Sequence, residues 1–370
     1  MDPLAHSLVG ATLAETGLRR ASPFAMITLV VGANLPDVDA VAMAFGSDTA
    51  LLVRRGWTHG VVGLAVLPIA WVGLVVAFDR LVRRRRDPDA APVRVGALLG
   101  LSYLAILTHP FLDWLNTYGV RVLMPFDTAW FYGDALFIID PWIWLLTASA
   151  VVLAWSRRAL GVSGWAILGI GTTALIVGVD RTPLVAKVVW LLGIGAIVVA
   201  RATAGARPVP RLAIAALGLV AVYLVTIFAG NAVAQRETER WLQARGVDAT
   251  VLMVGPVPAR PFARDVIARD EEHYHFIELD WARDERFSIS HPPVPVGSQD
   301  DPIVEAALHA PSVRGLRAWL RFPAFAVEST DTGHRVTIRD VRYARPQTER
   351  STPLGKAVVD LDADLRPLGE

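Results

Sequence analysis

"ILTHPFLDWLNTYGV", residues 106–120, is an apolar stretch that carries His109, Asp113 and Asn116. On a helix, side chains three and four positions apart lie on the same face, so these polar groups form one stripe. The remaining positions are apolar enough for a helix inside a membrane. The stretch therefore predicts a membrane helix whose polar stripe packs against another segment, holds a metal ion, or does both.

The composition around this stretch indicates a polytopic membrane protein. The 370-residue chain is 53% hydrophobic, with a mean hydropathy of +0.42, which is too apolar for an ordinary soluble domain. Its formal net charge of +1 gives no indication of nucleic-acid binding, and none is expected. Because the chain has no cysteine, any transition metal would need histidine and carboxylate ligands.

The chain falls into an apolar part and a polar part. Residues 231–370 contain no long apolar run and include alternating or β-branched stretches that are typical of strands. We predict a mainly α protein, with a helical transmembrane domain over residues 1–230 and a smaller β-rich domain over residues 231–370. The predicted spans are 23–42, 59–79, 94–115, 140–156, 161–179, 184–200 and 211–230, each close to the roughly 20 apolar residues that a bilayer requires. The predicted strands are 273–281, 286–291, 334–343 and 356–362, and a helix over 239–245 continues the last span.

The basic loops predict the orientation in the membrane. The strongest signal is "DRLVRRRRD" at 79–87, and the arginines near 157 and 201–211 fall on the same side. We therefore expect the loops at 83–92 and 201–210 to be cytoplasmic. The C-terminal domain and the loop at 116–139 would lie outside the cytoplasm, in a multi-pass protein of a bacterial plasma membrane.

This orientation places the N-terminal histidines at one face. His6, in a short helix over residues 3–18, lies at its outer end, and His59 and His109 lie at the outer ends of their spans. Ionisable groups within a membrane are costly and usually functional. The clustering favours a site at the outer face.

Two stretches carry carboxylates that suit a metal site. His109 and Asp113 are one helical turn apart, which allows both to bind one ion; the alternative is a hydrogen bond that holds helices together. In "NLPDVDA", at 34–40, Pro36 ends a helix just before Asp37 and Asp39. One of these carboxylates could bridge two metal ions, and the alternative is a polar turn at the membrane surface.

"RRGWTHG", residues 54–60, places His59 at a predicted helix start with Thr58 as the candidate N-cap. Arg54 and Arg55 precede it in the outer loop. They could hold a phosphate or carboxylate by paired hydrogen bonds, or they could bind lipid head groups.

The candidate site residues are predicted either to bind metal or to take part in catalysis, and a few further polar residues have other expected roles. Asn116 would hydrogen-bond a bound water or ligand. Asp134 could be a loop ligand, and Asp140 could be either a helix cap or a group that orients a ligand. His273 and His275 share one face of a predicted strand, and an exposed strand face is favoured over a metal site there. The predicted metal ligands are His6, Asp37, Asp39, His59, His109 and Asp113, and the predicted catalytic residues are Asp37, Arg54, Arg55 and Asn116.

These residues lie in blocks that resemble the YdjM-like family of inner-membrane proteins. The resemblance covers about residues 4–142 and is looser in "RFPAFAVEST" and "VTIRDVRY" near the C-terminus. It implies a metal-dependent hydrolase in the inner membrane. The blocks are H-S-L-x-G at 6–10, L-P-D-x-D at 35–39, R-G-x-T-H-G at 55–60, and H-P-x-L-D-x-x-N-x-Y-G at 109–119.

The order His, Asp, His and then His-x-x-x-Asp is also similar to that of zinc-dependent phospholipase C and its nuclease relatives. In that group, helices carry a cluster of zinc ions that hydrolyses phosphodiesters. The further His and His-x-x-x-Glu ligands of that group have no match after Asp113. One or two ions are therefore expected here rather than three.

These observations lead to one main hypothesis. The chain would be a membrane-bound hydrolase that uses a divalent metal, zinc or alternatively manganese, on the ester or phosphoester of a lipid or lipid-linked substrate. The partners expected are membrane lipids and that substrate. One alternative is a non-enzymatic membrane scaffold whose polar stripe only locks helices together. Another is a transporter, which would require polar residues across the bilayer rather than at one face.

Overall fold

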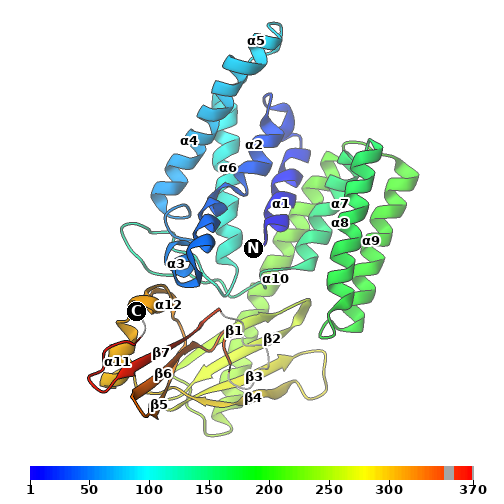
Figure 1. Cartoon of the computed structure of the whole chain (residues 1–370). Coiled ribbons are helices and arrows are strands. Elements are labelled where there is room, and N and C mark those ends of the chain that lie inside the picture. Colours follow the sequence, from blue (N-terminus) through cyan, green and yellow to red (C-terminus); the bar gives the residue numbers. More distant parts are fainter. Residues whose placement is uncertain (346–353, 369–370) are drawn as a thin grey trace. The chain divides into compact units, whose positions relative to one another are not determined.

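A computed structural model describes residues 1–345 and 354–368 (Figure 1). Contacts between residues divide the chain into two compact units. The first unit contains Met1–Val38, Trp57–Gly230 and Pro256–Phe262, and the second contains Asp39–Gly56, Asn231–Gly255 and Ala263–Glu370. The chain therefore passes between the units at the predicted boundary after Gly230 and at other points, including both ends of the short segment 39–56.

The first unit is helical and contains the candidate membrane spans. Among the residues that the structure describes, five helices are long and apolar enough to cross a bilayer: the continuous run Val61–Arg86, α6, α8, α9 and α10. α2 passes the same test only together with the 3-10 helix η2 (Leu35–Phe45), across a bend of 41°. The helices are α1 (Pro3–Glu15), α2 (Ala25–Gly32), α4 (Val61–Phe78), α5 (Arg84–Arg86), α6 (Val95–Trp114), α7 (Pro141–Trp155), α8 (Ala159–Gly178), α9 (Leu184–Ala204) and α10 (Pro210–Gln243).

One predicted span, 140–156, is shorter than expected. It forms α7, whose 15 residues extend about 22 Å at 1.5 Å per residue, less than the hydrocarbon thickness of about 30 Å. Asp140 accepts hydrogen bonds from the backbone N–H groups of Trp142 and Ile143, each at 3.0 Å, so the helix begins at Pro141. The prediction of Asp140 as a cap is confirmed.

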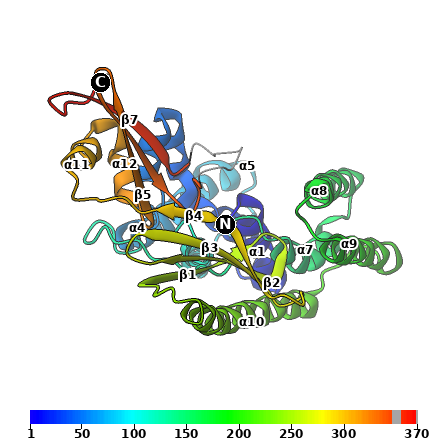
Figure 2. The same ribbon diagram turned by 90° about the horizontal axis from the view of Figure 1, so that it is seen from below.

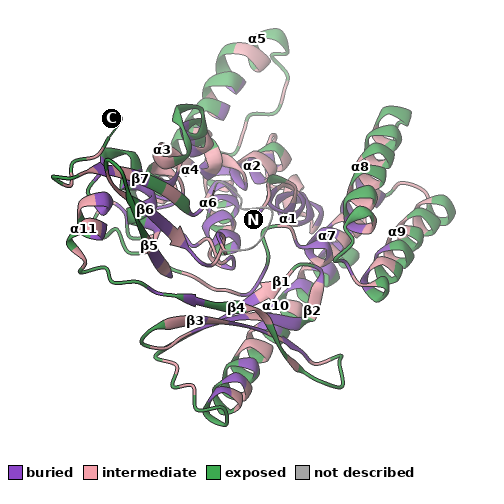
Figure 3. Ribbon diagram, turned by 60° about the horizontal axis from the view of Figure 1, so that its bottom comes forward, coloured by how far each residue is buried: buried purple, intermediate pink, exposed green. Residues whose placement is uncertain are grey.

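Short helices α1 and α7 form the interior of the first unit, and longer helices present apolar surface. α1 packs against α2, α6 and α7, which explains why its polar residues His6, Thr12 and Glu15 are all buried. By contrast, α8 and α9 are largely exposed (Figure 3). Leu160 is 86% exposed and Leu184 is 75% exposed, as expected for helices that face lipid.

The basic ends of the helices lie together at one end of the first unit. Glu15 accepts hydrogen bonds from Arg19 Nη1 at 2.9 Å and from Trp155 Nε1 at 2.8 Å. Next to Trp155, the guanidinium of Arg201 donates to the Ser156 hydroxyl at 2.6 Å. The run Val61–Arg86 has 26 residues and is therefore about 39 Å long, so its basic end is distant from the loop that precedes Val61. The arginines and the candidate site consequently lie at opposite ends of this unit.

The described strands of the second unit form two antiparallel sheets. Their strand orders are β1-β2-β3-β4 and β5-β6-β7. Residues 231–243 of α10 lie along the first sheet (Figure 2), where Ala234 and Leu242 pack with Val266 and Ile277. The strands are β1 (Val251–Val257), β2 (Arg260–Arg269), β3 (His273–Asp280), β4 (Phe287–Pro295), β5 (Pro323–Thr330), β6 (Gly333–Asp340) and β7 (Lys356–Asp362), and the short helices are α3 (Ser47–Val53), α11 (Pro302–Leu308) and α12 (Arg314–Trp319).

The strand predictions are confirmed at β3, β4, β6 and β7, and α10 continues beyond the last span as predicted. β1, β2 and β5 were not predicted. β2 is buried at Ala263–Arg264 and again at Val266–Ala268, so its sequence does not follow the alternation of a sheet with one exposed face.

Candidate metal centre

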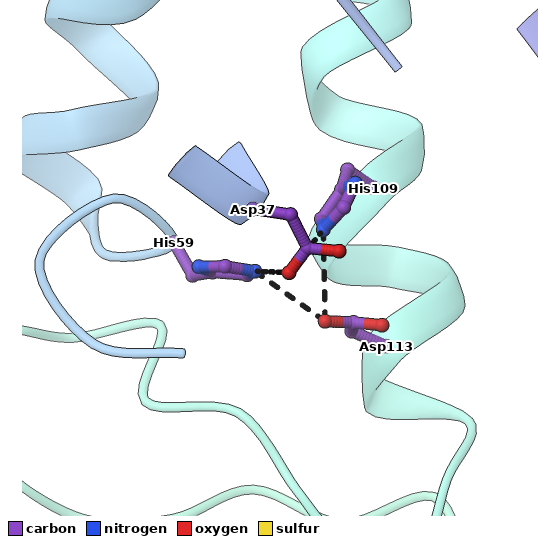
Figure 4. Close-up of side chains that lie close together, drawn as sticks. All are labelled: Asp37, His59, His109 and Asp113. Carbon is purple, nitrogen blue, oxygen red and sulfur yellow. Dashed lines mark ion pairs between the residues drawn. The ribbon is translucent and has the colours of Figure 1, made fainter. Parts of the chain in front are cut away.

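Four predicted ligands come together in the first unit: Asp37, His59, His109 and Asp113 (Figure 4). One ligand atom from each lies within 4.8 Å of all the others. Asp113 Oδ2 is 3.3 Å from His59 Nε2 and 3.7 Å from His109 Nε2. Asp37 Oδ1 is 3.7 Å from His109 Nε2 and 4.0 Å from His59 Nε2. Two imidazoles and two carboxylates thus face one point.

Three segments supply these side chains. His109 and Asp113 are adjacent on the last turns of α6, as their spacing predicts. Asp37 follows Pro36 in η2, and its backbone N–H donates to the Asn34 carbonyl at 3.1 Å. Three of the four side chains are fully buried, whereas Asp37 is 18% exposed. Asp37 is therefore the donor through which solvent or a substrate would reach the cluster.

The loop that carries His59 differs from its prediction. α4 begins at Val61 with Gly60 as its N-cap and no side-chain capping bond, so the prediction of Thr58 as the cap is wrong. Val61 N–H donates to the Val122 carbonyl at 3.0 Å, and a Cβ on Gly60 would overlap the Met124 carbonyl oxygen. This close approach requires glycine and delays the helix start beyond His59.

Hydrogen bonds on the far side of each imidazole orient Nε2 toward the carboxylates. His109 Nδ1 is 2.6 Å from the Ala33 carbonyl oxygen, which can only accept, so Nδ1 carries a proton and Nε2 is the nitrogen that faces the carboxylates. His59 Nδ1 is 3.0 Å from the Thr58 hydroxyl. Among the residues that the structure describes, none gives the buried Nε2 of His109 a hydrogen bond. Metal-binding histidines are commonly held in this way by their other nitrogen.

His6 approaches the cluster from the opposite side of Asp113. Its ring stacks on that of His109 with centroids 3.8 Å apart, and its Nε2 is 3.4 Å from Asp113 Oδ1. The α-amino group of Met1 forms an ion pair with the same oxygen. The two oxygens of Asp113 therefore face different groups, Oδ2 toward His59 and His109, and Oδ1 toward His6.

Four further predicted site residues do not belong to this group of donors. Asp39, Arg54 and Arg55 belong to the second unit, where Asp39 Oδ2 accepts from the Arg55 backbone N–H at 2.8 Å. Asn116 is buried one turn beyond Asp113 and donates to the Leu136 carbonyl at 3.2 Å. The catalytic or ligand roles of these four residues stay predictions.

The C-terminal histidines have a different environment. His275 Nε2 is 2.6 Å from Asp270 Oδ2, and the rings of His273 and His275 are 6.4 Å apart. Partial burial acts to raise the pKa of Asp270, but hydrogen bonds from His275 and from the backbone N–H groups of His273 and Glu272 lower it to about 2. Within the described ranges, no group of three or more metal-binding side chains includes them.

The geometry of the four donors fits a small divalent ion. A tetrahedral zinc site with bonds of about 2.0–2.1 Å has donor atoms about 3.3 Å apart. The separations between carboxylate oxygens and imidazole nitrogens are 3.3–4.0 Å, and all four donor atoms lie within 4.8 Å of one another, so the cluster could close around such an ion. The donor set also matches the nitrogen and oxygen chemistry that a cysteine-free chain must use.

Residues 1–233 match the family model described as "YdjM inner membrane protein". The chain belongs to this family. It is therefore a multi-pass membrane protein, and the resemblance inferred from the sequence blocks is confirmed. The chain is also 23% identical over 141 residues to "Uncharacterized protein YfhP" of Bacillus subtilis (strain 168). That match covers 37% of this chain and 39% of the relative, and no solved structure matches the chain.

Proposed function

We propose that this protein is a membrane-bound, metal-dependent hydrolase that cleaves an ester or phosphoester bond of a lipid or lipid-linked substrate. The observation that carries the proposal is the convergence of Asp37, His59, His109 and Asp113 at the end of the helices. A site at the end of membrane helices suits a substrate that is itself held in the bilayer. Membership of the membrane-protein family supports the location, and the donor set supports the use of a metal.

The four residues would hold one divalent ion, zinc or alternatively manganese. His6 would contribute to a second ion, because its Nε2 faces the other oxygen of Asp113. A divalent metal held by these residues would supply Lewis acidity and would make water a better nucleophile. The proton transfer and the orientation of the substrate would be carried out by side chains of the protein.

Asp37 is the carboxylate best suited to proton transfer, because it is the only one of the four donors with an exposed side-chain fraction above zero. It would accept the proton of the attacking water as the oxygen–phosphorus or oxygen–carbon bond forms. It would then pass this proton to the leaving oxygen as the ester bond breaks, so that the leaving group departs as the alcohol. Asn116 would orient that water, and Arg54 or Arg55 would neutralise a phosphate oxygen.

A hydrolysis assay tests this proposal. The full-length protein in nanodiscs of phosphatidylethanolamine and phosphatidylglycerol is supplied with zinc or manganese, and the products are identified by mass spectrometry. The proposal expects metal-dependent release of a lipid fragment, abolished in His109→Ala. If the wild-type protein binds metal but cleaves neither these nor lipid-linked phosphoesters, hydrolysis is rejected; if it binds no metal, the scaffold hypothesis is preferred. Metal flux across proteoliposomes would instead favour a transporter.

We also propose that the site and the C-terminal domain lie outside the cytoplasm. The gathering of Arg19, Arg201 and the basic end of the run Val61–Arg86 at one end of the first unit supports this orientation. Because the chain lacks cysteine, single cysteines can report it. In intact cells, Thr128→Cys and Ser298→Cys should react with an impermeant maleimide, whereas Asp89→Cys and Thr203→Cys should react only after permeabilisation. Labelling of Ser298→Cys only after permeabilisation would reverse the proposed orientation.

A further inference from the structure

The segment between two of the four metal-ligand candidates belongs to the second unit. The chain leaves the first unit after Val38 and returns to it at Trp57, so the segment Asp39–Gly56 folds with the C-terminal part of the chain. Asp37 and His59 are each within two residues of these crossings. His109 and Asp113 instead lie within one continuous helix, α6. Two of the donors are therefore covalently tied to the second unit, and two are not.

α3, in the middle of this segment, is hydrogen-bonded to α12 through the carboxylate of Asp48. Asp48 accepts hydrogen bonds from the backbone N–H groups of Gly315 and Leu316, each at 2.9 Å. The two helices lie side by side (Figure 1), so close that a Cβ on Gly315 would overlap the Asp48 carbonyl oxygen. The contact thus requires an acid at one position and a glycine at the other.

α12 is in turn held against the second sheet. The Arg342 guanidinium donates to the Trp319 carbonyl at 3.1 Å and pairs with the buried carboxylate of Asp340 at 2.8 Å. Asp340 also accepts from the backbone N–H of Arg321, just after α12, at 2.8 Å. These contacts make α12 a fixed part of the sheet domain rather than a loosely attached helix.

The two ends of the segment are tied to each other. Asp39 Oδ2 accepts from the Arg55 backbone N–H at 2.8 Å, and Asp39 Oδ1 is 3.8 Å from Arg54 Nε. The bond joins positions near the start and the end of the segment, so the segment is a closed loop. A closed loop transmits the position of α3 to both of its ends, and hence to Asp37 and His59 together.

We propose that the segment Asp39–Gly56 is a positioning arm. Through this arm, the second unit, which contains both sheets, sets the separation of Asp37 and His59 from the donors on α6. Asp48 is a positioning residue in this account, because it acts through the arm and not as a ligand. The effect on metal affinity rests on the metal site proposed above. The mechanical coupling itself does not, and it can be measured in metal-free protein.

The test compares the full-length variants Asp48→Ala, Asp48→Asn and Gly315→Ala with Asp284→Ala, which removes an exposed acid of the same unit. Hydrogen–deuterium exchange of metal-free protein should increase at residues 34–38 and 57–61 in Asp48→Ala and Gly315→Ala, and less in Asp48→Asn. Zinc affinity, measured by chelator competition, should fall about tenfold, in the range expected for residues that orient ligands, with stoichiometry at saturation unchanged.

The outcomes separate this inference from the proposed function. If the wild-type protein binds no metal, the proposed function fails, and the exchange measurement alone decides the coupling. If exchange increases only within residues 46–56 and not at 34–38 or 57–61, the positioning arm is rejected. An unchanged zinc affinity in Asp48→Ala, when the wild type binds zinc, also rejects it. Gly315→Ala reaches the same contact from α12, so misfolding of one variant does not remove the test.

Discussion

Alanine in place of His59, His109 or Asp113 is expected to abolish stoichiometric metal binding. Each of these side chains is fully buried and supplies one of the four donors that cluster within the described part of the chain, so its loss would leave an incomplete coordination sphere. Asn116→Ala should behave differently, because its amide donates to the Leu136 carbonyl and lies outside the cluster. Its effect should be limited to about 10- to 100-fold in affinity. Elemental analysis after dialysis measures the metal content per chain, and chelator competition measures the affinity for the metal.

Folding must be checked separately in these variants. Thermal unfolding monitored by circular dichroism in the same detergent provides that control. If all four variants fold and keep the full metal content, the cluster is structural and the scaffold hypothesis is the better account. If His6→Ala lowers the content from two ions to one, the second ion is located beside Asp113 Oδ1.

The second large effect is expected from Asp340→Ala, which should destabilise the second unit by about 3–5 kcal/mol, the usual cost of leaving one member of a buried ion pair alone. Asp340 and the Arg342 side chain are almost completely buried, and they form two hydrogen bonds of 2.8 Å. Asp340→Ala would remove the acceptor of the Arg321 N–H as well. Hydrogen–deuterium exchange of β5–β7 across a denaturant series measures the loss.

The same sheet offers a matched control and a pH dependence. Asp360 pairs with Arg335 on the exposed surface at 2.7 Å, and Asp360→Ala should leave the stability of the sheet nearly unchanged. Burial acts to raise the pKa of Asp340, but Arg342 and backbone N–H groups hold it below its usual value. A depressed carboxyl pKa contributes stability above the unfolded value of about 3.9, and this contribution is lost as the pH falls toward the folded value. If the stability of the sheet falls with pH below 4 in the same way for Asp340→Asn and for the wild type, this assignment is contradicted.

The sequence predicted the long helices and the alternating strands, because hydrophobic length and periodicity are local properties. β7 occupies the predicted residues 356–362, and α10 continues past the last span as expected. α7 occupies Pro141–Trp155 within the predicted span 140–156, and it begins after Asp140 because this residue caps it. The association of residues 39–56 with the sheet domain has no local signal, since it depends on Asp48 meeting a helix more than 260 positions away.

For the site, the four residues that the structure brings together are among the six metal ligands predicted from the motifs. One helical turn fixes the separation of His109 and Asp113, and this rule is independent of the rest of the fold. The hydrogen bond from His109 to the Ala33 carbonyl and the placement of Met1 against Asp113 were not predicted. Backbone carbonyls and chain ends carry no residue-type signal, so contacts of this kind become visible only in the folded structure.

The most direct test of the central claim is the metal content and coordination of the wild-type, full-length protein. Elemental analysis combined with X-ray absorption spectroscopy reports both on one sample. The account predicts one or two tightly bound divalent ions per chain, in a sphere of imidazole nitrogen and carboxylate oxygen, with the imidazole contribution lost in His59→Ala and His109→Ala. Folded wild-type protein that retains no divalent metal after purification and reconstitution, or metal whose sphere lacks imidazole, would contradict it.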